Sequence, residues 1–154
     1  MNLLFVCSGN TCRSPMAAYL GTAIAEKDYP QSGFRFDSAG IATSDGYPAT
    51  ENAIEALSEL GIDASAHRSR QFQPYMVELA HYIICMTALH KDALCRSFPD
   101  AADRIFVIGE LSGSGCDIPD PYMGSLAVYR ITRDRLREEI AAILKRLDKE
   151  QESH

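Results

Sequence analysis

Short apolar runs alternate along this chain with longer segments in which apolar residues recur at helical spacing. The first run, from Leu3 to Cys7, is apolar without interruption, as expected for a strand that is buried on both faces. The same reasoning predicts further strands at Phe34 to Ser38, Tyr82 to Met86 and Ile105 to Ile108. Helices are predicted at Pro15 to Glu26, Thr50 to Gly61, Tyr75 to Ala80, Thr87 to Phe98 and from about Ser125 onward, with a tail that frays after Asp148.

This alternation is typical of βαβ units around a parallel sheet. We therefore expect one doubly wound α/β domain over residues 1–154, with a four-stranded parallel sheet and helices on both faces. In such folds, ligands bind beyond the carboxyl ends of the strands. The loop after Cys7 and the loop that holds Asp120 both follow strands, so both should open on that edge of the sheet.

The composition excludes several kinds of partner. The 154 residues include 15 basic and 21 acidic ones, a formal net charge of −6, so no broad basic field is available for a nucleic acid or an anionic membrane. The first apolar run is too short for a signal peptide, and we expect a cytoplasmic protein that is a monomer. The five cysteines form no C-x2-C pair and the four histidines are scattered, which predicts free thiols, no bound metal and no cofactor.

The segment from Cys7 to Ser14 reads CSGNTCRS, a C-x5-R-S sequence between a predicted strand and a helix N-terminus. Backbone N–H groups in such a loop converge on a tetrahedral oxyanion, and the helix adds about half a positive charge. The same donors favour a nucleophilic thiolate at Cys7, while Arg13 offers a planar fork for two phosphoryl oxygens. Ser14 steadies the sulfur, Gly9 lets the loop curl and Asn10 braces it from within. The nucleotide-binding pattern G-x4-G-K-[ST] is absent from the sequence.

The sequence resembles the low-molecular-weight protein tyrosine phosphatase family over nearly the whole chain. The motifs that carry the resemblance are VCSGNTCRSPMA, DSAG at Asp37 to Gly40, HRSRQ at His67 to Gln71, CMT at Cys85 to Thr87 and DPYMGS at Asp120 to Ser125. The resemblance implies that Cys7 attacks phosphorus, Arg13 holds the phosphoryl group and Asp120 protonates the leaving atom. It also implies a bond from His67 to the loop, a reversible disulfide between Cys12 and Cys7, and a substrate-binding set formed by Ser8, Gly9, Asn10, Thr11, Cys12, Ser14 and Tyr122.

Chemistry gives an independent reason for an acid at the Asp120 position. A departing group needs a proton, and the same carboxylate can later activate the water that hydrolyses the thiophosphate. Asp117 is the neighbouring candidate, with the weaker claim. Without the resemblance, the residues favour a histidine satisfied by the backbone at His67, and Cys12 is also compatible with a small packing residue.

Two departures from the family pattern bear on the phosphorylated protein that would be the substrate. The chain has no tryptophan, and the segment 41–46 lacks the aromatic that tyrosine-specific members usually carry, so Tyr122 is left as one wall of a thin slot. Thr11 stands where tyrosine phosphatases usually carry a bulkier aliphatic residue, and bacterial protein arginine phosphatases carry threonine in a CTGNTCRS loop. A small polar residue leaves room for a guanidinium, with which Asp120 could pair. The sequence thus favours phosphoarginine over phosphotyrosine.

Two other classes of function stay open at this point. A thioredoxin-coupled arsenate reductase would need two further cysteines to relay a disulfide outward, and Cys85 and Cys95 are the candidates, although core packing explains both. A phosphate-binding module without turnover is the second alternative. The presence of Cys7, Arg13 and Asp120 together speaks against it.

Overall fold

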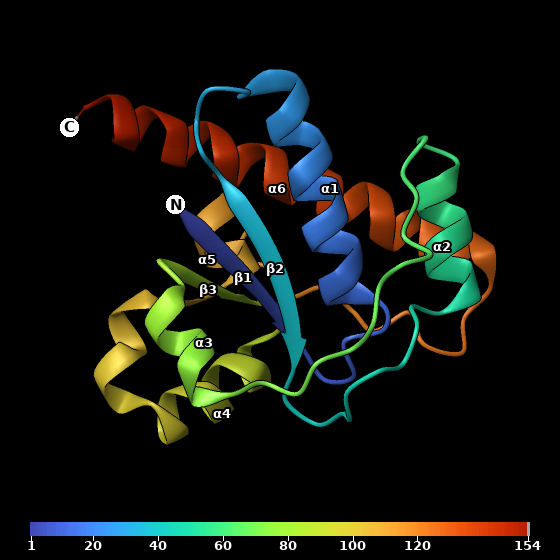
Figure 1. Ribbon diagram of the computed structural model, residues 1–154, viewed down its shortest axis with the longest axis horizontal. Helices are drawn as coiled ribbons and strands as arrows, with labels where there is room; N and C mark the ends of the chain where they lie inside the picture. Colours follow the sequence, from blue (N-terminus) through green and yellow to red (C-terminus); the bar gives the residue numbers. More distant parts are fainter. Residues whose placement is uncertain (154) are drawn as a thin grey trace.

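The computed structural model describes residues 1–153 and joins four strands into one parallel sheet (Figure 1). The strands are β1 (Asn2–Cys7), β2 (Arg35–Gly40), β3 (Tyr82–Cys85) and β4 (Ile105–Val107), in the order β2-β1-β3-β4. The register pairs Cys7 with Gly40 and Val6 with Cys85, so the carboxyl ends of three strands meet at one edge. His154, which the sequence-based domain includes, lies outside the described residues.

Helices cover both faces of this sheet, which confirms the predicted architecture (Figure 1). Side chains alternate along β1, so that Leu3, Phe5 and Cys7 join one core and Leu4 and Val6 join the other. The first core is closed by α1 (Arg13–Asp28), α2 (Glu51–Ser58), α5 (Ile108–Ser112) and α6 (Leu126–Glu152). The second is closed by α3 (Pro74–Leu79), α4 (Ala88–Ser97) and the 3-10 helix η1 (Pro99–Arg104). Among residues 1–153, every helix is too short or too polar to cross a bilayer.

Several element boundaries differ from the sequence-based expectation by a few residues, and three of these differences have an identifiable cause. Helix α1 begins at Arg13 rather than Pro15, because the Ser14 hydroxyl does not cap the helix and contacts the preceding loop instead. Ile108 starts α5 instead of ending the last strand, since the Glu110 carboxylate accepts a hydrogen bond from the Val107 N–H at 2.9 Å and satisfies the helix start. Helix α6 continues to Glu152, beyond the predicted fraying point, supported by an i,i+4 ion pair between Arg146 and Glu150.

Candidate active site

The loop between β1 and α1 forms the floor of a pocket at the carboxyl edge of the sheet. The pocket has a volume of about 330 Å³. Its lining consists of Cys7, Ser8, Gly9, Asn10, Thr11, Cys12, Arg13, Ala42, Thr43, Tyr47, Asp120 and Tyr122. The fold therefore brings together the Cys7 loop and the Asp120 loop, which are more than a hundred residues apart in sequence, as the strand pattern predicts.

The Cys7 sulfur lies at the bottom of this pocket with a hydroxyl beside it. Cys7 is 2% exposed, and its Sγ is 2.9 Å from Ser14 Oγ. Asn10 Nδ2 donates to the same Ser14 oxygen at 2.7 Å. Because that oxygen already accepts from Asn10, its own proton is free to point at the sulfur, where it stabilises negative charge.

Asn10 holds the loop in shape from a fully buried position. Its backbone is left-handed, with φ of 56°, and its Oδ1 accepts a hydrogen bond from the Arg70 backbone N–H at 2.9 Å. His67 Nε2 lies 2.7 Å from the Asn10 carbonyl oxygen and donates to it. Burial lowers the pKa of His67 below its usual range, which favours a neutral ring with its proton on Nε2. The family resemblance implies a bond from His67 to the loop, and the structure contains this contact.

Two substitutions of Asn10 distinguish the contribution of its side-chain contacts from that of its left-handed backbone. Asn10→Ala removes the hydrogen bonds to Ser14 Oγ and from the Arg70 N–H, and it keeps a Cβ at positive φ without the side-chain contacts that make this conformation tolerable, so we expect the free energy of unfolding to fall by about 2–4 kcal/mol. Asn10→Gly loses the same contacts, but glycine adopts positive φ without strain, so its free energy of unfolding should fall by less. Urea unfolding measures both, and calorimetry with inorganic phosphate should reveal weakened binding in both variants. Wild-type phosphate affinity in Asn10→Gly would contradict a bracing role for the side chain.

Two glycines play different roles from those that the sequence suggests. The positive φ in the loop belongs to Asn10, so the expectation that Gly9 provides the curl is wrong, and a Cβ at Gly9 would meet only Thr11 Oγ1 at 3.6 Å. Gly40 is the glycine that the loop requires. A Cβ there would lie 2.6 Å from the Ser8 carbonyl oxygen, a backbone atom that cannot move without displacing the loop.

Arg13 reaches into the pocket from the first turn of α1. It is almost fully buried, its Nη1 donates to the Ile118 carbonyl oxygen at 3.0 Å, and its Nη2 lies 3.8 Å from Asp120 Oδ2. The Asp120 side chain is 53% exposed at the mouth. Asp117, the competing candidate, accepts a hydrogen bond from the Ala88 N–H at the start of α4 and does not line the pocket.

Two tyrosines flank the mouth of the pocket, where the sequence predicts one. Tyr122 is 62% exposed and Tyr47 is 57% exposed, and both line the cavity. The expectation of a thin slot is therefore wrong. Tyr47 directly follows the segment 41–46, and its backbone N–H donates to Ser69 Oγ at 2.9 Å, which fixes the turn that carries it. An aromatic after the flexible Gly46 is the sequence signal that could have identified it.

Cys12 lies at the wall of the pocket among hydroxyl groups. Its Sγ is 3.3 Å from the Tyr129 hydroxyl and 3.6 Å from Thr50 Oγ1. Burial, followed by the contact with Cys12, raises the pKa of Tyr129 to about 12, so the phenol keeps its proton. Both Cys7 and Cys12 are free thiols in this structure.

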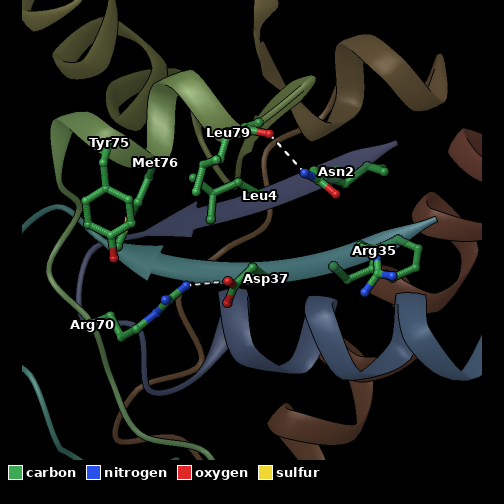
Figure 2. Close-up of a pocket in the computed structure, with 11 residues that line it drawn as sticks. Asn2, Leu4, Arg35, Asp37, Arg70, Tyr75, Met76 and Leu79 are labelled. Carbon is green, nitrogen blue, oxygen red and sulfur yellow. Dashed lines mark hydrogen bonds and ion pairs between the residues drawn. The ribbon is translucent and has the colours of Figure 1, made fainter. Parts of the chain in front are cut away.

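Figure 2 shows Asp37 of the DSAG motif, which lies on β2, paired with Arg70 of the HRSRQ motif. Arg70 Nη2 forms an ion pair with Asp37 Oδ2 at 2.5 Å, and both side chains line a second cavity of about 330 Å³ next to α3. The backbone of the same Arg70 donates to Asn10, and its carbonyl oxygen accepts from the Gly40 N–H at 2.8 Å. The ion pair thus fastens the segment that supports the Cys7 loop.

Side chains suited to bind a metal ion do not gather at the pocket. Within residues 1–153, no three or more of His, Cys, Asp and Glu come together in a cluster of that kind. The pocket is lined instead by the Cys7 loop, by the Arg13 guanidinium and by the single carboxylate of Asp120.

Comparison with known proteins identifies the family. The family model described as low molecular weight phosphotyrosine protein phosphatase matches residues 2–153. A protein-arginine-phosphatase from Geobacillus stearothermophilus is 41% identical over 150 residues, 97% of each chain, and a low molecular weight protein-tyrosine-phosphatase from Acinetobacter johnsonii is 35% identical over 83% of this chain and 84% of its own. The solved YwlE arginine phosphatase from G. stearothermophilus superposes with a TM-score of 0.91 at 40% identity, covering 99% of this chain and 96% of the other. The chain belongs to the low molecular weight phosphotyrosine protein phosphatase family.

Proposed function

We propose that this low molecular weight phosphatase hydrolyses phosphorylated protein side chains through a cysteinyl-phosphate intermediate, and that it favours phosphoarginine over phosphotyrosine. The observation that carries the proposal is the Cys7 sulfur at the base of a pocket, 2.9 Å from the Ser14 hydroxyl, with Arg13 in the wall and Asp120 at the mouth. A nucleophile, an oxyanion cradle and an acid are the parts that phosphoryl transfer by a thiolate requires.

The reaction follows from these positions. The Cys7 thiolate attacks phosphorus and forms the S–P bond, while the bond from phosphorus to the leaving atom breaks and Asp120 supplies a proton to that atom. Arg13 and the loop N–H groups hold the phosphoryl oxygens as charge moves onto them. Asp120 then takes a proton from a water molecule while the water oxygen attacks phosphorus. The S–P bond breaks, and Cys7 leaves as a thiolate beside the Ser14 hydroxyl. Inorganic phosphate is released.

The preference for phosphoarginine rests on Thr11 and on the mouth of the pocket. Thr11 lines the cavity, and its carbonyl oxygen accepts from the Thr50 N–H at 3.0 Å, which anchors this side of the loop to α2. A threonine leaves more room than a larger aliphatic residue, and the exposed Asp120 carboxylate can pair with a guanidinium. Relatives named protein-arginine-phosphatase at 41% and 39% identity support this preference. Tyr47 and Tyr122 favour a planar group of either kind, since both an aromatic ring and a guanidinium stack on tyrosine.

Substitution of Thr11 tests the preference directly. We expect Thr11→Ile to lower the ratio of kcat/KM for a phosphoarginine peptide to that for a phosphotyrosine peptide by about tenfold or more, because the added methylene narrows the cavity. Thr11→Val is the matched control, since it removes the hydroxyl and keeps the shape. If the ratio is unchanged in Thr11→Ile, another residue selects the substrate.

The positions of the cysteines on opposite faces of the sheet argue against an arsenate reductase. Cys7 belongs to the core under α1 and α6, whereas Cys85 belongs to the core under α3 and α4, with Cys95 packed against it. Burial also raises the pKa of the Cys85 thiol, so it is a poor thiolate donor. A disulfide relay from Cys7 to Cys85 would therefore have to join side chains that belong to opposite faces of the sheet. Loss of arsenate reduction in Cys85→Ala, with phosphatase turnover intact, would revive that alternative.

A further inference from the structure

A chain of three side chains connects α4 to the Cys7 loop and has no part in the reaction described above. Thr87, the N-cap of α4, accepts a hydrogen bond from the His90 backbone N–H at 3.3 Å. The His90 ring lies with Nδ1 3.0 Å from Thr87 Oγ1 and Nε2 2.9 Å from Ser8 Oγ. Ser8 directly follows Cys7 and lines the pocket. A histidine that is 5% exposed thus bridges the helix start and the loop.

The capping hydrogen bond of Thr87 influences which nitrogen of the His90 ring carries the proton. Thr87 Oγ1 already accepts from the His90 backbone, so its own proton is available for Nδ1. With Nδ1 as acceptor, the ring proton is on Nε2 and is donated to Ser8 Oγ. The Ser8 hydroxyl then keeps its own proton for the pocket. In the opposite tautomer, two N–H groups converge on Thr87 Oγ1 and the Ser8 proton turns toward the ring.

The surroundings of His90 keep the ring neutral. Burial, and after it the positive charge of Arg13, lower the pKa of His90 to about 4, against smaller opposing effects of Asp117 and Asp120. A charged ring would donate from both nitrogens, and Thr87 would then lose the acceptor for its proton. Near neutral pH, the network therefore holds one proton on the imidazole.

We propose that His90 is a positioning residue of the active site, which donates to Ser8 from Nε2 and so directs the Ser8 hydroxyl proton toward the phosphoryl group in the pocket. This inference rests on the proposed function, because it assigns a donor to the same phosphoryl site. It gives a role to the CMT motif as well, since Thr87 sets the tautomer of the ring. In this arrangement Ser8 adds a side-chain donor to the backbone donors of the loop.

The test compares His90→Leu, His90→Gln, Ser8→Ala and the double variant Ser8→Ala/His90→Leu. Glutamine can place an amide N–H near the position of Nε2, whereas leucine keeps bulk and removes the donor. His81→Leu is the control, since His81 is exposed and its Nδ1 contacts Asn2 at the amino end of the sheet. Two readouts are measured: the dissociation constant of inorganic phosphate by calorimetry, which needs no turnover, and kcat/KM for p-nitrophenyl phosphate.

We expect His90→Leu and Ser8→Ala each to raise the dissociation constant of inorganic phosphate by about tenfold, the effect of one lost hydrogen bond to a charged group. The double variant should be no worse than either single one, and His90→Gln should recover most of the loss. Additive losses, or a glutamine variant as weak as the leucine variant, would show that His90 only packs α4 and would overturn the inference. Absence of phosphatase turnover in the wild type would instead defeat the proposed function, and the phosphate-binding series would still report on His90.

A second measurement tests the neutral ring. Since the His90 pKa is about 4 in the folded protein and near 6.5 when unfolded, the unfolded chain binds the proton more readily, and stability falls as the pH drops from about 6.5 to 4. His90→Gln should lose less stability over this range. His67, whose pKa is also lowered, contributes equally to both proteins. Identical pH profiles of melting temperature would mean that folding does not lower the pKa of His90, and the argument for a ring held neutral by its surroundings would fail.

Discussion

Replacing Cys7 with serine is expected to reduce turnover by at least about a thousandfold while phosphate still binds, because the nucleophile is lost and the cradle is kept. A serine hydroxyl fits the space of the thiol but stays protonated at neutral pH. The cradle, with Arg13 in its wall and Ser14 at its base, is arranged to stabilise a negative sulfur. Removal of that negative charge should even strengthen binding of inorganic phosphate, since two anions no longer share one pocket.

Single-turnover kinetics measure the loss of rate in Cys7→Ser, and calorimetry measures its affinity for phosphate. Cys12→Ser is a suitable control, because Cys12 is also buried in the loop and its Sγ contacts hydroxyl groups that serine can satisfy. We expect it to stay within about tenfold of the wild-type rate. If Cys7→Ser retained a comparable rate, Cys7 would not be the nucleophile and the proposed mechanism would be wrong.

The sequence predicts the main architecture because strands and helices are marked by patterns of neighbouring residues. Uninterrupted apolar runs mark strands buried on both faces, and the parallel order follows from the helices between them. The C-x5-R-S loop could be located because a strand end and a helix start enclose it. Asp120 could be assigned to the same pocket because parallel strands bring their carboxyl ends to one edge.

The features that the sequence does not reveal depend on contacts between distant segments. Asn10 rather than Gly9 takes the left-handed conformation because its side chain gains partners at Ser14 and Arg70, which are known only once the loop is folded. Tyr47 reaches the pocket because Ser69 holds its backbone. The contact of His90 with Ser8 joins residues that are 82 apart in the sequence. Tertiary contacts of this kind leave no periodic trace.

Asp120→Asn should produce the second large effect, and its size should depend on the leaving group. Asparagine can still accept the hydrogen bond from the Tyr122 N–H, made at 3.0 Å to Oδ1, but it cannot supply a proton. The guanidine of arginine is a strong base and leaves poorly unless it is protonated, so kcat/KM for a phosphoarginine peptide should fall by about 100- to 1000-fold. For p-nitrophenyl phosphate, whose phenolate leaves readily, the loss in kcat/KM should stay within about tenfold.

The choice of kcat/KM for this comparison follows from the two steps of the reaction. In the proposed mechanism, hydrolysis of the cysteinyl phosphate is the same for every substrate and also uses Asp120, so the value of kcat would combine both roles of the carboxylate. By contrast, kcat/KM reports only the steps up to departure of the leaving group. Asp117→Asn is the matched control, because that side chain contacts the Ala88 N–H outside the pocket, and it should leave both substrates close to wild type. Equal losses on the two substrates in Asp120→Asn would mean that Asp120 positions the phosphoryl group through Arg13, 3.8 Å away, and that the proton comes from another group.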